Sequence, residues 1–140
     1  MPLTAHEFKK EHEAIERELA ELETIIHTFP VNYPNLIHVL KRLYLFWDGH
    51  EEKESIFFKA LAKKGYTIPI RKIFFEHGQL KKHREHLLNA LQSGSEDKTH
   101  YVLMNDGMAM VNKLRQHMAD EDWILYALPK SAQQVETQFF

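Results

Sequence analysis

The sequence predicts an all-α protein, folded as an antiparallel up-and-down four-helix bundle. Four long segments repeat apolar residues at helical spacing without a convincing strand pattern, and helix-breaking residues separate these segments by short connections. Short connections make consecutive helices antiparallel neighbours. The 140 residues have the length of one ordinary domain, and the hydrophobic share of 44% is enough for a core.

Capping residues and breakers bound the first two helices. The first opens at Thr4–Glu7, where a threonine and a glutamate three residues apart form a capping-box pattern, and it ends before Pro30. Pro34 suits the first turn of the second helix, where its missing amide hydrogen is not needed. Gly65 suits the end of that helix.

The third and fourth helices are bounded in the same way. Pro69 can open the third helix, and Gly94 follows its end. The fourth begins within residues 96–100 and ends near Leu128. We therefore expect one helical domain over residues 1–128 and a short tail, residues 129–140, to which the sequence assigns no role.

Charge and composition exclude several classes of function. The formal net charge of −2 favours neither nucleic acid nor an anionic membrane as a partner. The chain has no cysteine, which excludes disulfides, thiolate metal sites and cysteine nucleophiles. The first residues are polar, unlike a signal peptide, and no apolar run reaches membrane-spanning length. The expected location is the cytoplasm.

Histidine interrupts the apolar stripe that each helix should turn toward the core. Read at alternating steps of four and three residues, the stripes are Phe8, His12, Ile15, Leu19, Leu22, Ile26; Leu36, Leu40, Leu43, Trp47, His50, Glu54, Phe57, Leu61; Ile70, Ile73, His77, Leu80, Arg84, Leu87, Leu91; and Leu103, Gly107, Met110, Leu114, His117, Glu121, Ile124, Leu128. Counted from the predicted helix ends, the four histidines have nearly the same height, with a looser match of about half a turn between the second and third helices. They and the two glutamates therefore share one layer of the bundle.

Such a layer needs a compensating charge. An unpaired buried carboxylate costs several kcal/mol, and an unsatisfied imidazole costs ~1–3 kcal/mol. A cation compensates both groups best, because imidazole nitrogen and carboxylate oxygen are its ligands. His50 with Glu54, and His117 with Glu121, lie four residues apart on one helix face and reach one centre together. Six ligands suit two metal ions, which the two glutamates can bridge. Ligation without sulfur favours iron or manganese, with zinc possible.

With this pattern, the chain resembles the hemerythrin-like proteins of the HHE cation-binding family over residues 4 to about 128. The resemblance rests on four motifs in order: His12 in "KEHEAI", His50 with Glu51 and Glu54 in "HEEKE", His77 in "FEHGQL", and His117 with Glu121 in "HMADE". It implies a non-haem di-iron centre inside a four-helix bundle. His12 and His77 would be ligands from the first and third helices, and Glu54 and Glu121 the bridging carboxylates.

One departure bears on function. Oxygen-carrying hemerythrins have two histidines four apart on the third helix, whereas Ile73 and Lys81 stand at that spacing from His77. Glu51 matches an extra acidic ligand of the family branch that includes an iron-sensing domain, so the resemblance implies that it binds metal. Asp122 lies five residues after His117, as does the aspartate of oxygen carriers, and it competes with Glu121 for the ligand role.

Several other residues stand apart from this layer. Six histidines, expected at the surface, are His6, His27, His38, His83, His86 and His100. Gly107 either permits close packing or leaves space for a small molecule. Arg84 occupies an inward position below the layer and either pairs with an acid or extends to solvent. Phe139 and Phe140 suggest a contact with another subunit.

The expected function is a di-iron protein that binds or senses oxygen, nitric oxide, peroxide or iron at an open iron position. Zinc or manganese would be substitute metals, and the protein would act as a monomer or homodimer. One alternative is an enzyme or repair protein that acts on peroxide or nitric oxide, or donates iron for iron-centre repair. Another is a structural interaction bundle with vestigial ligands.

Overall fold

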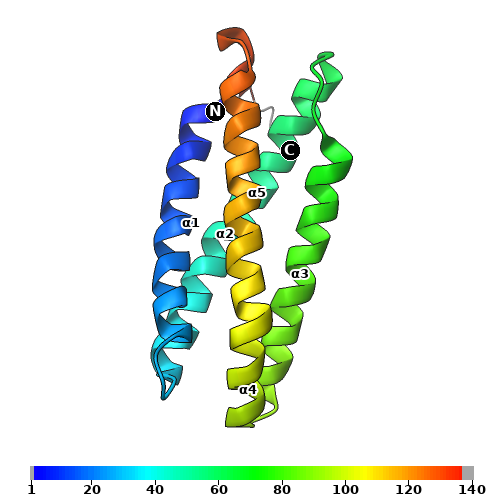
Figure 1. Ribbon diagram of the computed structural model, residues 1–140. Helices are drawn as coiled ribbons and strands as arrows, with labels where there is room; N and C mark the ends of the chain where they lie inside the picture. The colour runs from blue at the N-terminus through cyan, green and yellow to red at the C-terminus, as the bar shows by residue number, and fades with distance from the viewer. Residues whose placement is uncertain (1, 137–140) are drawn as a thin grey trace.

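The chain folds into a bundle of four long helical rods. The computed structural model describes residues 2–136. Its helices are α1 (Ala5–Ile26), α2 (Tyr33–Lys63), α3 (Ile70–Gln92), α4 (Glu96–Val102), the π-helical turn η1 (Leu103–Gly107) and α5 (Met108–Ala127). The last three follow one another without a break and form the fourth rod. Figure 1 shows consecutive rods running in alternating directions along the bundle. The prediction of an all-helical bundle is confirmed.

Local side chains start and stop these helices. The side chains of Thr4, Asn32 and Ser95 each accept a hydrogen bond from the backbone amide three residues later, at 3.1, 3.1 and 3.2 Å. These bonds satisfy amide groups that the first helical turn leaves unpaired. Gly65 and Gly94 have φ angles of 96° and 70°, the left-handed region in which a side chain is strained, and each closes a helix.

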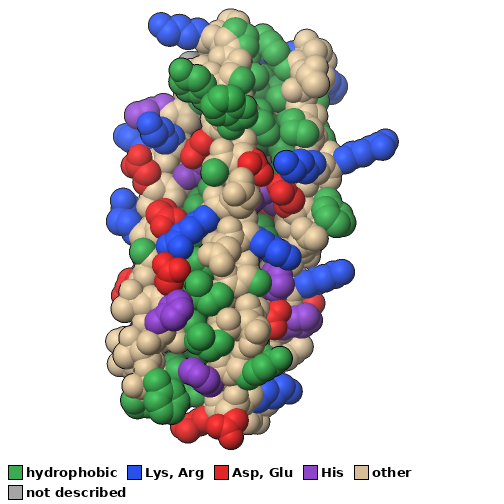
Figure 2. Space-filling view, in the orientation of Figure 1, with side chains coloured by type: hydrophobic (Ala, Val, Ile, Leu, Met, Phe, Trp, Pro, Cys, Tyr) green, Lys and Arg blue, Asp and Glu red, His purple; other side chains and the backbone are tan. Residues whose placement is uncertain are grey.

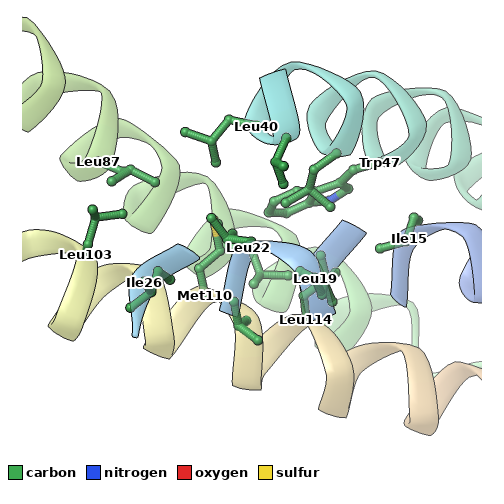
Figure 3. Close-up of a cluster of buried hydrophobic side chains, with 14 of the residues drawn as sticks. Ile15, Leu19, Leu22, Ile26, Leu40, Trp47, Leu87, Leu103, Met110 and Leu114 are labelled. Atoms are coloured by element: carbon green, nitrogen blue, oxygen red, sulfur yellow. The ribbon is translucent and has the colours of Figure 1, made fainter. Parts of the chain in front are cut away.

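The apolar core consists of two clusters, one on each side of a polar layer. On α1, for example, Phe8 belongs to one cluster and Ile15 to the other, with His12 between them. Figure 3 shows part of the larger cluster, to which every rod contributes. Its labelled side chains are Ile15, Leu19, Leu22, Ile26, Leu40, Trp47, Leu87, Leu103, Met110 and Leu114. The inward positions expected for the first two helices are all buried.

The π-helical turn η1 brings the fourth rod close to α1. Gly107 lies at its end, and a Cβ atom added there would stand 3.2 Å from Cδ1 of Ile26. Of the two roles expected for this glycine, the structure therefore shows close packing. Farther along, Leu125 is buried, whereas Ile124 and Leu128, both expected on the inward stripe, are half-buried. The stripe read from the sequence is thus offset near the end of α5.

Arg84 does not point into the core. It is half-buried, and its guanidinium carbon lies 4.0 Å from the centre of the Tyr44 ring and 4.7 Å from that of Trp47. Its Nη1 donates a hydrogen bond to Oδ1 of Asp48 at 2.6 Å. The guanidinium therefore covers two aromatic faces and pairs with an acid at the edge of the bundle.

The tail returns to the beginning of the chain. After the short helix η2 (Lys130–Ala132), strand β2 (Gln134–Glu136) pairs antiparallel with β1 (Pro2–Thr4), and Leu3 lies opposite Val135. The sequence analysis did not predict this pair of strands. Phe139 and Phe140, expected to contact another subunit, lie outside the described residues. Within residues 2–136, no helix is long and apolar enough to cross a membrane.

Candidate metal centre

Four histidines and two glutamates lie buried in one layer between the two apolar clusters. Each has an exposed fraction between 1% and 6%. Helix α1 contributes one of them, α2 two, α3 one and α5 two: His12; His50 and Glu54; His77; His117 and Glu121. Each of the six stands on the inward-facing stripe of its helix, whose other buried positions are mostly apolar.

The first half of the layer is built around the imidazoles of α1 and α2. Nε2 of His12 lies 2.9 Å from Nε2 of His50. Oε1 of Glu121 lies 3.2 Å from the first nitrogen and 3.8 Å from the second. Oε2 of Glu54 lies 3.2 Å from Nε2 of His50. Two nitrogens and one oxygen of Glu121 therefore lie close together, and the oxygen of Glu54 approaches them beside His50.

The second half repeats this arrangement with the imidazoles of α3 and α5. Nε2 of His77 lies 3.1 Å from Nε2 of His117. Oε1 of Glu54 lies 3.1 Å from the first nitrogen and 3.7 Å from the second. Oε2 of Glu121 lies 2.8 Å from Nε2 of His117. Each glutamate thus directs one oxygen to each imidazole pair.

The outer nitrogens of the imidazoles face a second set of carboxylates. Nδ1 of His12 lies 2.7 Å from Oδ1 of Asp122; the other outer contacts join His50 to Glu11 at 2.8 Å, His117 to Glu76 at 2.9 Å and His77 to Glu51 at 3.4 Å. When an outer nitrogen donates its hydrogen to a carboxylate, the inner nitrogen of a neutral ring presents a lone pair. Histidines that bind metals have such outer partners.

The carboxylates of the layer raise the pKa of three of its imidazoles, those of His12, His50 and His117. Burial lowers the pKa of His50, but the carboxylates of Glu11, Glu121 and Glu54 outweigh burial and raise it to about 11. Burial likewise lowers the pKa of His117, which Glu121 and Glu54 raise to about 11. The pKa of His12 is also raised, because Asp122 and Glu121 outweigh burial.

The carboxylate of Glu54 shows the opposite shift. Burial raises its pKa, but contacts with Glu121 and with the imidazoles of His117, His50 and His77 hold the pKa far below the usual range. The layer therefore combines ionised carboxylate with imidazole that gains a proton. Positive charge is favoured at the point where the inner nitrogens meet.

The donor set fits metal ions on independent grounds. Within the described residues, two groups bring one ligand atom each to within 4.8 Å of one another: Glu54, His77, His117 and Glu121, and His12, His50 and Glu121. Oε2 of Glu121 is buried and has no hydrogen-bond partner, although Nε2 of His117 lies 2.8 Å away. Carboxylate oxygen and imidazole nitrogen are both metal-ligand atoms, so a cation that displaced the imidazole hydrogen would satisfy both buried groups.

The structure separates the acidic residues that face the inside of the layer from those that lie against its outer nitrogens. Both oxygens of Glu121 face inward, whereas Asp122 contacts the outer nitrogen of His12, so Glu121 is the carboxylate of α5 inside the layer. Glu51, which the resemblance implies is a ligand, lies against the outer nitrogen of His77 and 3.4 Å from Nζ of Lys81. Its Oε2 is buried without a hydrogen-bond partner. The ligand role that the resemblance implies for Glu51 is untested, and its contact in this structure is that of an outer partner.

Sequence reasoning missed the outer carboxylates Glu11 and Glu76. The sequence contains a pattern that could have indicated them, because each glutamate directly precedes a histidine of the layer, His12 or His77. Each reaches across the bundle to the histidine of the neighbouring helix, and this crossing cannot be read from a stripe on one helix.

The histidines expected at the surface lie outside the layer. His6, His27, His38 and His86 are exposed, whereas His83 and His100 are half-buried. The ring of His100 packs edge-on against Phe29, with the ring centres 5.4 Å apart. His83 and His86 share one acidic partner.

The comparison with known families agrees with the geometry of the layer. The family model described as hemerythrin HHE cation binding domain matches residues 3–128, which include all six buried donors. No curated protein and no solved structure matches the chain. Because the match covers most of the sequence, the chain belongs to the hemerythrin HHE cation-binding domain family.

Proposed function

We propose that this protein holds two non-haem iron ions in the buried layer and binds a small molecule there: oxygen, nitric oxide or peroxide. The observation that carries the proposal is the division of each bridging carboxylate. Glu54 and Glu121 each direct one oxygen to each of the two imidazole pairs. A single ion would leave one imidazole pair and its carboxylate oxygens without a partner.

The ligand chemistry supports iron. The donors are imidazole nitrogens and carboxylate oxygens without sulfur, a set that suits iron and manganese and also binds zinc. Bound iron would supply an open coordination position for a diatomic molecule or peroxide. We propose His12, His50, Glu54, His77, His117 and Glu121 as the ligands.

The residues around the layer limit which molecules reach it. Phe8 packs edge-on against His50, with ring centres 5.4 Å apart, and against Phe57 at 4.9 Å, which closes the layer on that side. Between α1 and α5, an open surface groove of about 230 Å³ has His12, Met118 and Ala119 in its wall. We propose this groove as the approach by which a small molecule reaches the side of His12. We further propose that the protein acts in the cytoplasm without nucleic acid or membrane.

The test is the metal content of anaerobically prepared protein. We expect two irons per chain and new charge-transfer absorption on exposure to air. Glu54→Gln should lower the content below two, because it removes a bridging charge from both ions. Glu52→Gln, at an exposed position two residues away, is the matched control and should keep two.

The opposite result is equally informative. Less than one metal per chain, with unchanged helix content in wild type and Glu54→Gln, would refute the di-iron proposal and favour a structural bundle with vestigial ligands. Two irons per chain without any spectral change in oxygen, nitric oxide or peroxide would retain the centre and refute the proposed small-molecule binding.

A further inference from the structure

A second cluster of histidine and carboxylate lies on the surface, away from the buried layer. Nδ1 of His83 and Nδ1 of His86 lie 2.9 and 3.0 Å from the same oxygen, Oδ1 of Asp106. The side chains of the three residues are 18%, 60% and 24% exposed. Figure 2 shows histidine and acidic side chains gathered on the α3 side of the molecule. This cluster is more accessible than the buried donors.

Two elements bring these side chains together. His83 and His86 are three residues apart on α3, so they share one helix face. Asp106 lies in the π-helical turn η1, which packs against α3. Single π-helical turns inside α-helices occur frequently at functional sites. His83 is six residues beyond His77, which places it ~9 Å farther along the helix axis. The cluster is therefore separate from the buried layer.

The chemistry of the cluster suits a cation. Burial raises the pKa of Asp106, but the hydrogen bonds of His83 and His86 outweigh burial and hold it below the usual range, so the carboxylate is ionised at neutral pH. A neutral imidazole carries its hydrogen on either nitrogen, so both Nδ1 atoms can present a lone pair. Two imidazoles and one carboxylate are a common ligand set for zinc that retains water in the fourth position.

Binding of one ion by all three residues requires a small rotation of a side chain. The ligand atoms of His83, His86 and Asp106 do not all lie within 4.8 Å of one another, although both imidazoles contact the same oxygen. His86 is the most exposed of the three, so rotation of its side chain meets little resistance. Asp106 and His83, which are more enclosed, supply the fixed part of the cluster.

We propose that His83, His86 and Asp106 form a second, surface-exposed site for one divalent transition-metal ion, with Zn²⁺ as the probe. The ion would replace the hydrogen bonds that the two imidazoles now make to Asp106. It would link α3 to η1, and it would leave the six buried donors unchanged. The site does not depend on the metal content of the buried layer.

The experiment is a calorimetric titration of Zn²⁺ into iron-loaded protein, with the iron content measured before and after. Wild type should bind one Zn²⁺ per chain without loss of iron. Asp106→Asn and His86→Gln should each weaken this binding about tenfold or more, since even the loss of an outer partner of a metal ligand costs that much. His38→Gln, an exposed histidine elsewhere on α2, is the matched control and should bind like wild type.

Two results would overturn the proposal: wild type that takes up no Zn²⁺ beyond its iron, or Asp106→Asn and His86→Gln variants that bind Zn²⁺ as tightly as wild type. The first would leave the cluster as a hydrogen-bonded contact between α3 and η1. If the buried layer holds no iron, the difference in Zn²⁺ stoichiometry between wild type and Asp106→Asn still reports on the surface site. Failure of the di-iron proposal is therefore distinguishable from failure of this one.

Discussion

The contact between Glu51 and His77 yields the sharpest test of the proposed centre. Three of the four outer contacts measure 2.7–2.9 Å, whereas Oε1 of Glu51 lies 3.4 Å from Nδ1 of His77, beyond the usual hydrogen-bond distance. Loss of an outer partner typically lowers metal affinity 10–100-fold, or about 1.4–2.7 kcal/mol. We expect Glu76→Gln to fall in this range and Glu51→Gln to cost less than about 1.4 kcal/mol.

The assay is competition for iron by a chelator of known affinity, with the number of ions per chain measured separately. Glu52→Gln serves as the control for a charge change at an exposed position of the same helix. All three variants should keep two ions per chain. A Glu51→Gln variant that loses one ion, or that binds iron more weakly than Glu76→Gln, would refute the outer position and show that Glu51 binds the metal directly.

Two further predictions concern the metal-free protein and the glycines. The pKa of His50 and His117 is about 11 against an ordinary 6.5, so their stabilising contribution is complete below pH 6.5 and declines as pH rises toward 11. The pKa of Glu54 is lowered from 4.5, so its contribution is complete above pH 4.5 and declines as pH falls. The melting temperature of metal-free protein, measured across pH, should peak between pH 4.5 and 6.5; a maximum above pH 8 would contradict these shifts. A Cβ atom at position 78 would have no neighbour within 4 Å, so Gly78→Ala should raise the free energy of unfolding in urea by about 1 kcal/mol. A Cβ atom at position 107 would stand 3.2 Å from a side chain of α1, so Gly107→Ala should stabilise the protein less or destabilise it. Equal gains would argue against close packing at η1.

The periodic parts of the molecule were predictable from the sequence. Every inward position expected on α1 and α2 is buried, including His12, His50 and Glu54. These helices keep a regular rhythm from a capped start to their end, so a count of residues is enough to assign their faces. His77, His117 and Glu121 were found in the same way, because the layer lies in the regular parts of α3 and α5.

What depends on contacts between helices was not predictable. The π-helical turn places Gly107 against Ile26, and no local pattern in "LMNDG" indicates a wider turn. The strands β1 and β2 have three residues each and lie more than 100 residues apart in the sequence, so neither forms a recognisable pattern alone. The outer carboxylates follow from which helix faces which, and this cannot be deduced from each helix alone.

The paired distances within the buried layer indicate an approximate rotational symmetry between the two halves of the chain. Each separation in the first half has a counterpart in the second: 2.9 and 3.1 Å between imidazoles, 3.2 and 2.8 Å within a helix, 3.2 and 3.1 Å across the bundle, and 3.8 and 3.7 Å on the longer diagonal. The two histidines of a pair are 38 residues apart in the first half and 40 in the second.

The symmetry fails at one outer partner. Asp122 follows Glu121 directly and contacts His12, and the equivalent position after Glu54 is Ser55, which cannot supply a carboxylate. The outer carboxylate of His77 is instead Glu51, one turn before Ser55, at 3.4 Å. Apart from this partner the halves correspond, because each hairpin of two helices carries two imidazoles and one glutamate that faces both imidazole pairs. Two copies of the first hairpin, related by a twofold axis, would therefore carry the same six donors, so the layer is in effect one three-residue pattern used twice.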